Sequence, residues 1–340
     1  MRSSLVVSCC LSGIFSIPIC AQDYEPSLTE FGHPDLQGVW NFSTYAPFER
    51  PEGLGDREFY SQEELETAAQ NRINSAINRD QRETEIAQQA LESMNSTSVA
   101  SVNYFWMERE GLAENNRTSV IIYPPNGRIP TLQDSIKIQH SDQNGVREIP
   151  GERPVRYTHG GIARNGPEDR GLSERCMVFN SGPPLYSGPY NNNIQIFQNR
   201  DHVVILAEMG FDARIVPLQG GEHVDENISQ WSGDSRGYFD GSVLVVETRN
   251  FTEKVGSLSL RDRGYGNAAN RILIERFMPT SSTSMSYEWT IEDLATFTDK
   301  IVGVMPMTKT DSNLYEYACH AGNYAIANIL KGARAEEREL

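Results

Sequence analysis

The chain has 340 residues, a mass of 38.1 kDa and a formal net charge of −16. That length suits one large domain or two modest ones, and 38% hydrophobic residues are enough to build a core, which argues against wholesale disorder. The acidic balance repels phosphate backbones and anionic lipid surfaces. We therefore expect no nucleic-acid partner.

The first 21 residues have the pattern of a secretory signal peptide. Arg2 supplies a positive start, residues 5–20 are apolar apart from three serines, and Ala21 precedes polar residues. The apolar run is too short and too rich in serine to cross a bilayer, which takes about 20 residues. We expect cleavage near Ala21, a secreted or periplasmic protein, and no membrane insertion.

Cleavage would leave two of the five cysteines, Cys176 and Cys319. In an oxidising compartment, two thiols most simply form one disulfide. The alternative is a catalytic thiol at Cys319 beside His320. It is disfavoured because adjacent residues of an extended strand point to opposite faces.

The expected elements begin with helices and then change to strands. A strand is expected over 36–42, and a capping box at Ser61–Glu64 begins one long or two shorter amphipathic helices covering 62–94. After residue 117 we expect strands over 118–123, 193–198, 202–209, 214–218, 236–239, 242–248, 271–278, 285–292, 300–308 and 313–319. An amphipathic helix over 323–338 closes the chain.

The strand order predicts the fold class. Sequential strands joined mostly by short turns, with Asp240-Gly241 as the clearest hairpin signal, are typical of an antiparallel meander. No helical crossovers separate the strands, which excludes a parallel sheet. Because a meander must hide its edges, we expect a mainly β fold closed into a lipocalin-like or calycin-like barrel, with a β-sandwich as the alternative.

The expected organisation has three parts. Residues 1–21 form the signal peptide, and residues 22–116 form an extended and helical segment that packs on the barrel. Residues 117–340 form the barrel domain with its C-terminal helix. We make no prediction of oligomeric state.

Six short motifs resemble those of one protein family. They are Gly166–Arg170, Ser173–Cys176, Tyr190–Asn193, Trp231–Gly237, Val245–Phe251 and Tyr315–His320. The resemblance is to a large group of secreted bacterial proteins without an established activity, and it extends from Leu36 to about Glu337. It implies export and a shared β-rich fold, and it assigns no catalytic residue. Where many members have His-Glu-Gly-Asn, this chain has Ala321 in place of the glutamate.

Motifs for nucleophilic, nucleotide or metal chemistry are weak. Gly233–Gly237 matches G-x-S-x-G, but a strand and a hairpin turn follow it, whereas a nucleophile elbow needs a helix there. We therefore interpret it as a loop leading into a strand. Glycine-rich phosphate motifs are absent from the sequence, so we expect no cofactor. The six histidines are widely spaced, although dispersed ligands could still converge on a metal site.

Charged residues within apolar strands are the main candidates for catalysis. Glu208, Glu247 and Glu275 each share a strand face with apolar residues two positions away, and Asp212 would share a face with Arg214. Carboxylates on apolar faces can have raised pKa values that suit proton transfer near neutral pH. The alternative is that such carboxylates pair with arginines and stabilise the sheet.

Two functions remain open. In an enzyme, Glu208 or Asp212 would transfer a proton to or from a small apolar or oxygenated substrate. The developing negative charge would be stabilised by Arg214, Arg236 or His320. Lyase, isomerase, cyclase or hydratase chemistry needs no nucleotide cofactor. In a non-catalytic periplasmic carrier of a hydrophobic ligand, the same buried charges would be structural.

The ligand or substrate is expected to be a small molecule. The side chains expected to contact it are Tyr190, Asn192, Trp231, Asp234 and Arg236. The asparagine cluster at 191–193 offers many amide donors and acceptors. Asparagines are also common in turns, which is the alternative interpretation of this cluster.

Overall fold

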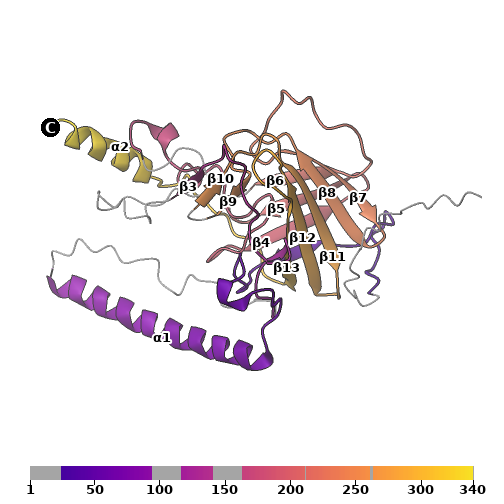
Figure 1. The fold of residues 1–340 in the computed structure, drawn as a ribbon, viewed down its shortest axis with the longest axis horizontal. Coiled ribbons are helices and arrows are strands. Elements are labelled where there is room, and N and C mark those ends of the chain that lie inside the picture. Colours follow the sequence, from indigo (N-terminus) through magenta and orange to yellow (C-terminus); the bar gives the residue numbers. More distant parts are fainter. Residues whose placement is uncertain (1–23, 94–115, 141–162, 211, 261–262, 340) are drawn as a thin grey trace, which may run out of the picture.

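The computed structural model describes residues 24–93, 116–140, 163–210, 212–260 and 263–339 (Figure 1). The predicted signal peptide lies outside the described residues. Two helices, α1 (Gln62–Ser93) and α2 (Ala325–Glu336), accompany the sheets. The strands are β1 (Gly38–Asn41), β2 (Ile121–Tyr123), β3 (Ile138–His140), β4 (Asn193–Gln198), β5 (His202–Ala207), β6 (Ala213–Pro217), β7 (Asp234–Asp240), β8 (Val243–Arg249), β9 (Leu258–Ser259), β10 (Arg263–Tyr265), β11 (Ile272–Pro279), β12 (Ser284–Glu292) and β13 (Ile301–Thr310).

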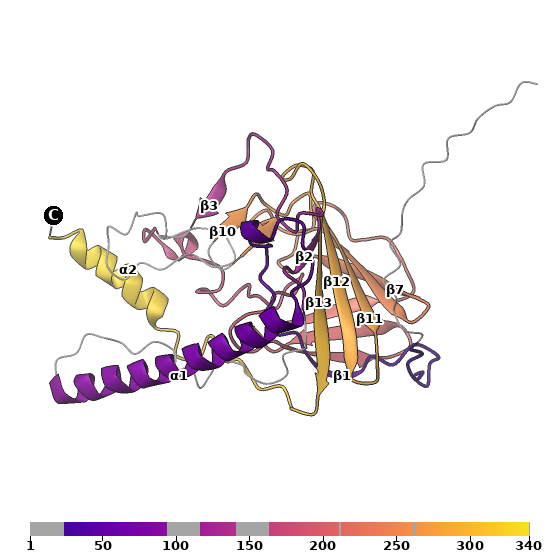
Figure 2. The ribbon, with the colours of Figure 1, turned by 60° about the horizontal axis from the view of Figure 1, so that its bottom comes forward.

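Ten antiparallel strands form a nearly closed barrel, which confirms the predicted fold class (Figure 2). Their order is β6-β5-β4-β1-β13-β12-β11-β8-β7, and β2 pairs with β13 off this path. The outer strands β6 and β7 share no ladder in the described part of the chain, and we call the line between them the seam. At the seam, the side chain of Val216 on β6 packs directly against the backbone of Gly237 on β7. A Cβ atom added at Gly237 would lie only 2.7 Å from Val216 Cγ1.

The N-terminal segment contributes a strand to the barrel, whereas the sequence predicted only that it packs on the barrel. Asn41 of β1 is paired with Asn193 of β4 on one side and with Thr308 of β13 on the other. These partners lie far away in sequence. The meander pattern therefore could not predict this position, because it pairs strands that follow one another.

Most predicted elements are present with shifted ends, and one predicted strand is wrong. Residues 62–93 form a single helix, α1. Residues 313–319 are irregular and Tyr315 is 71% exposed, because β13 already pairs with β1 and β12 and offers no free edge. We call residues 311–324 the strap. The sequence also missed the small sheet of β3, β10 and β9.

Large side chains fill the barrel interior. Burial alternates strictly along β5, β11 and β12, so every second residue points inward. Trp289 of β12 lies over Gly303 of β13, where an added Cβ would meet Trp289 Cζ2 at 2.2 Å. The phenol of Tyr287 and the ring of Phe277 are also fully buried. The centre of the barrel is therefore a packed core.

A disulfide joins the strap to the irregular segment that precedes β4. Cys176 and Cys319 are bonded as predicted, with their Cα atoms 5.8 Å apart. Asn323 Nδ2 adds a hydrogen bond to the Glu174 carbonyl. Both helices extend toward one side of the barrel, to the left in Figures 1 and 2. Among the described residues, neither helix combines the length and the apolar character that a bilayer crossing requires.

Candidate functional site

A buried polar network links three strands inside the barrel. Arg214 of β6 forms two hydrogen bonds with the carboxylate of Glu275 on β11, the one through Nη2 being 3.0 Å long. Tyr287 of β12 donates its hydroxyl to Glu275 Oε1 at 2.7 Å and accepts from the Leu185 amide at 3.1 Å. Glu275 has no exposed surface. The network connects β6 to β11 across the seam.

The electrostatics of this network favour a structural role. Burial would by itself lower the pKa of Arg214, but the charge of Glu275 and its hydrogen bonds raise it above the ordinary value. Burial and the Glu275 charge raise the pKa of Tyr287 well above its ordinary value. At neutral pH the Arg214 guanidinium therefore stays charged and the Tyr287 phenol stays protonated. Each of these side chains is satisfied by the others.

A hollow lies at the end of the barrel where β7, β11 and β13 begin, which we call the loop end. Its volume, including the open mouth, is about 320 Å³, of which about 20 Å³ is wide enough to hold water. Its walls combine aromatic, aliphatic and backbone groups from segments far apart in sequence: Val178, Phe179, Gly182, Pro183, Pro184, Tyr186, Trp231, Val255, Gly256, Ser259 and Arg271. It is a mostly apolar hollow with one cation.

Arg271 is that cation. It is 4% exposed, and its guanidinium donates to the carbonyls of Pro183, Gly256 and Ser257 at 3.0–3.3 Å. One face of the guanidinium stacks on Phe251, 3.8 Å from the ring centroid. Burial lowers the pKa of Arg271 to about 10, so it keeps its charge at neutral pH. Its hydrogen bonds in the described chain go to neutral carbonyls alone.

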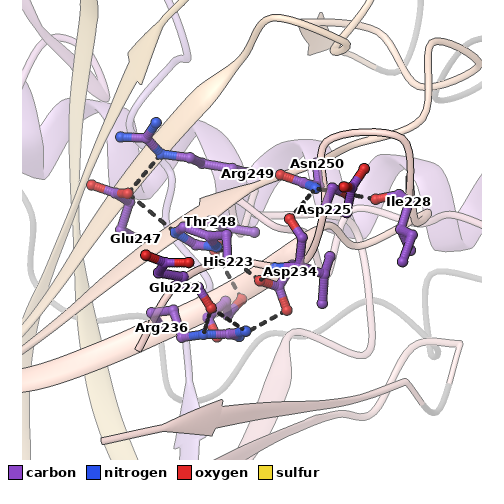
Figure 3. Close-up of polar contacts among 12 residues, drawn as sticks. Glu222, His223, Asp225, Ile228, Asp234, Arg236, Glu247, Thr248, Arg249 and Asn250 are labelled. Carbon is purple, nitrogen blue, oxygen red and sulfur yellow. Dashed lines mark hydrogen bonds and ion pairs between the residues drawn. The ribbon is translucent and has the colours of Figure 1, made fainter. Parts of the chain in front are cut away.

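A second charged cluster lies on the outer wall of the barrel (Figure 3). His223, in the loop between β6 and β7, lies between two carboxylates: Nδ1 is 2.8 Å from Asp234 Oδ2, and Nε2 is 3.2 Å from Glu247 Oε1. Arg236 pairs with Asp234 at 2.8 Å, and Arg249 pairs with Glu247 at 2.7 Å. Since carboxylates only accept, both histidine contacts are hydrogen bonds only when the ring carries both protons.

This cluster fixes the loop of residues 219–230 to β7 and β8. Although burial opposes it, the hydrogen bond from His223 and further donors lower the pKa of Asp234. Arg249 and His223 lower that of Glu247 in the same way. Asn250 adds hydrogen bonds from its amide to the carbonyls of residues 224, 225 and 228. We call this set the outer clasp.

The structure does not bring together the four predicted catalytic residues. Arg214 lies inside the barrel, whereas Glu208, the residue after β5, is buried and accepts a hydrogen bond from Asn193 Nδ2 at 2.7 Å. Asp212 is exposed and accepts a hydrogen bond from Ser232. His320 is exposed in the strap. These residues therefore do not form one acid/base site.

The predicted ligand-contacting residues also separate. Asn192 is fully buried and closes a turn through two hydrogen bonds with Gly188, as the turn interpretation expects. Tyr190, in the same turn, is half-buried. Asp234 and Arg236 belong to the outer clasp, and Trp231 lines the hollow.

Residues 234–237 of the G-x-S-x-G match already belong to β7, whereas the sequence predicted a loop leading into a strand. Ser235 lies within β7, and its hydroxyl bonds to Thr248 Oγ1 of β8 at 2.9 Å in the barrel interior. Asp234 and Arg236 point to the opposite, outer face, where the clasp holds them. Ser235 is therefore a packing residue.

Arg271 was not among the site residues that the sequence predicted. It was assigned only as the start of a predicted strand, because no local pattern distinguishes a buried arginine from an exposed one. Its partners at residues 183, 256 and 257 could have been found only from the folded chain.

A much larger groove, of about 1200 Å³ on the measure that gives about 320 Å³ for the hollow, lies where α1 begins. The two arginines that line it are already paired: Arg57 with Glu64 at 2.7 Å, and Arg117 with Glu58 at 3.5 Å. The groove therefore offers a ligand less charge recognition than Arg271 does.

Comparison of the chain with protein-family models, with curated proteins and with solved structures finds no match. The resemblance to a family of secreted proteins therefore stays a prediction. Within the described residues, no group of three or more His, Cys, Asp or Glu side chains is arranged to hold a metal ion.

Proposed function

We propose that this is an exported binding protein for a small organic molecule, taken up in the hollow at the loop end of the barrel. The observation that carries the proposal is the hollow itself, in which walls from four separate segments surround one buried cation. Ligand sites are commonly concave, mostly apolar and supplied with a few placed polar groups. The predicted signal peptide and the disulfide support an oxidising compartment outside the cytoplasm.

The size of the hollow defines how a ligand would fit. Only about 20 Å³ is wide enough for water, which corresponds to about one water molecule, so a polar head group of the ligand would take the place of that water. The remainder of the ligand would lie toward the mouth, against the half-buried rings of Trp231 and Tyr186. The packed centre of the barrel argues against a carrier of the kind that encloses its ligand at the barrel axis.

A ligand screen tests the proposal. We expect small aromatic or aliphatic compounds to bind in ligand-observed NMR, and Trp231→Ala to weaken binding at least about tenfold because it removes a wall of the hollow. Tyr238→Ala is the control, since Tyr238 is 53% exposed on the outer wall. Hits that bind equally to Trp231→Ala and to the unaltered protein would place the ligand elsewhere.

An enzyme is the second candidate. The favouring observation is that Tyr287 hydrogen-bonds to Leu185, whose neighbours Pro184 and Tyr186 line the hollow. In that enzyme the Tyr287 hydroxyl, which donates to Glu275 Oε1 in this structure, would turn toward the hollow and pass its proton to the bound ligand. Tyr287→Phe would then abolish turnover of a ligand that it still binds, whereas it would leave a pure binding protein unaffected.

A further inference from the structure

Among the described residues, no charged side chain forms a hydrogen bond or ion pair with Arg271. It is almost fully buried, and its three acceptors are backbone carbonyls. Glu275 and Asp293 act on it only through their fields. A buried cation is costly unless an anion compensates it. Arg271 therefore has the electrostatic character of a site for an anion.

The remaining donors of Arg271 have a defined geometry. Of its five N–H groups, two on Nη1 and one on Nη2 are used by the three carbonyls. Nε is buried and has no hydrogen-bond partner in the part of the chain described. Nε and Nη2 form one edge of the guanidinium, and two parallel N–H groups on such an edge match the two oxygens of a carboxylate. Phe251 covers one face of the guanidinium, and the Nε and Nη2 edge carries the donor without a partner among the described residues, so this edge is where a ligand would bind.

The surroundings of Arg271 favour a ligand with a single negative charge over a ligand with several. Arg271 is the one charged residue among those that line the hollow, and most of the others are apolar or aromatic. The whole chain carries a net charge of −16, which disfavours approach by multiply charged anions such as phosphate esters.

We infer that the ligand of the hollow is a monocarboxylate, whose carboxylate is bound by the Nε and Nη2 edge of Arg271 and whose apolar or aromatic remainder lies against Trp231 and Tyr186. This inference rests on the proposed function and names its ligand class. Charge-assisted, bidentate hydrogen bonds are among the strongest that a small ligand can make with a protein.

Matched pairs of ligands test the inference on the unaltered protein. Benzoate and benzamide have nearly the same shape and differ in charge, and acetate and acetamide form a smaller pair. We expect benzoate to bind at least about tenfold more tightly than benzamide in calorimetry. We also expect ¹³C NMR to show that the pKa of the bound carboxyl group is lowered, because a guanidinium favours its charged form. Equal affinities within both pairs would overturn the inference.

Variants locate the site. Arg271→Met should weaken benzoate at least about tenfold and benzamide little. Arg276→Met is the control, because it removes an arginine from the outward face of β11, the strand that follows Arg271. Unchanged benzoate binding by Arg271→Met would also overturn the inference. If Arg271→Met does not fold, the ligand pairs and the ¹³C titration decide alone.

The outcomes separate this inference from the proposed function. If neutral aromatic compounds bind and depend on Trp231 while no carboxylate binds, the carboxylate assignment falls and the binding function stands. If neither class binds, both fall.

Discussion

Replacing Glu275 by glutamine should weaken the barrel at its seam. The substitution keeps the shape of the side chain and removes its charge, so Arg214 would remain charged inside the barrel without a counter-ion. Glu275 accepts hydrogen bonds from both terminal nitrogens of Arg214 and from Tyr287. Breaking a buried ion pair from one side costs about 3–5 kcal/mol. We expect a loss of that size in the free energy of unfolding.

Urea denaturation followed by circular dichroism measures this loss. Glu64→Gln is the matched control, because Glu64 forms a similar paired contact with Arg57 on the exposed surface, and we expect no measurable change there. The damage should be localised, since β6 has a ladder with β5 alone. In hydrogen exchange, the amides of Ala213–Pro217 should therefore exchange faster in Glu275→Gln than in the unaltered protein.

A double variant provides the decisive comparison. Arg214→Met combined with Glu275→Leu removes both charges, and such replacements of a buried pair are often neutral or stabilising. The double variant should therefore be more stable than either single variant. A loss below about 1 kcal/mol in Glu275→Gln, or a double variant as unstable as the sum of the two single losses, would refute the role assigned to this pair.

Three further predictions follow from the packing and the clasp. Cys176→Ala with Cys319→Ala should lower the melting temperature, because it removes a closed loop with a sequence separation of 143, worth up to about 4–5 kcal/mol in the chain-entropy model; intact mass before and after reduction checks the bond itself. Gly303→Ala should lose about 1–3 kcal/mol in urea denaturation through its clash with Trp289, whereas the open position Gly332 should tolerate alanine far better. The outer clasp should weaken in acid: the folded state lowers the pKa values of Asp234 and Glu247, so their stabilisation is complete above the ordinary carboxyl range and is lost as pH falls through the lowered values. Asp234→Asn should flatten this acid limb in urea midpoints measured from about pH 6 to pH 3, and an unchanged limb would contradict the assignment.

The strands of the barrel were predictable because their signals are local. Alternation of apolar residues places β4, β5, β11 and β12 nearly to the residue, and Asp240-Gly241 marks the hairpin of β7 and β8. The position of β1 was not predictable. It depends on pairing with strands about 150 residues or more away, for which a single sequence carries no signal.

The sequence predicted which residues share a strand face, but it could not predict which face points inward. Glu208, Glu247 and Glu275 all lie among apolar neighbours, and only Glu275 enters the barrel. The strap covers part of the outer wall at Glu208, and the loop of residues 219–230 covers it at Glu247. Both faces of these strands therefore carry apolar residues, which removes the contrast on which the period-two pattern depends.

The hollow could not be predicted from the sequence, for a related reason. Trp231 was selected from its motif, whereas Arg271 and the loop of residues 178–186 were not. These residues come together only because the loops that carry them pack against one another at the loop end of the barrel. Local patterns determine strands, and the contacts between loops that form a site are determined by the whole fold.

The bond between Cys176 and Cys319 makes most of the barrel a covalent ring. The ring contains every strand from β4 to β13, and the predicted ligand contacts at Trp231 and Arg271 lie within it. A protease that cuts one exposed loop inside the ring opens the chain without releasing a fragment, because the two new ends stay joined through the sulfur atoms. Outside a cell, where proteases are common and repair is not, a nicked molecule would keep its strands together and its hollow assembled.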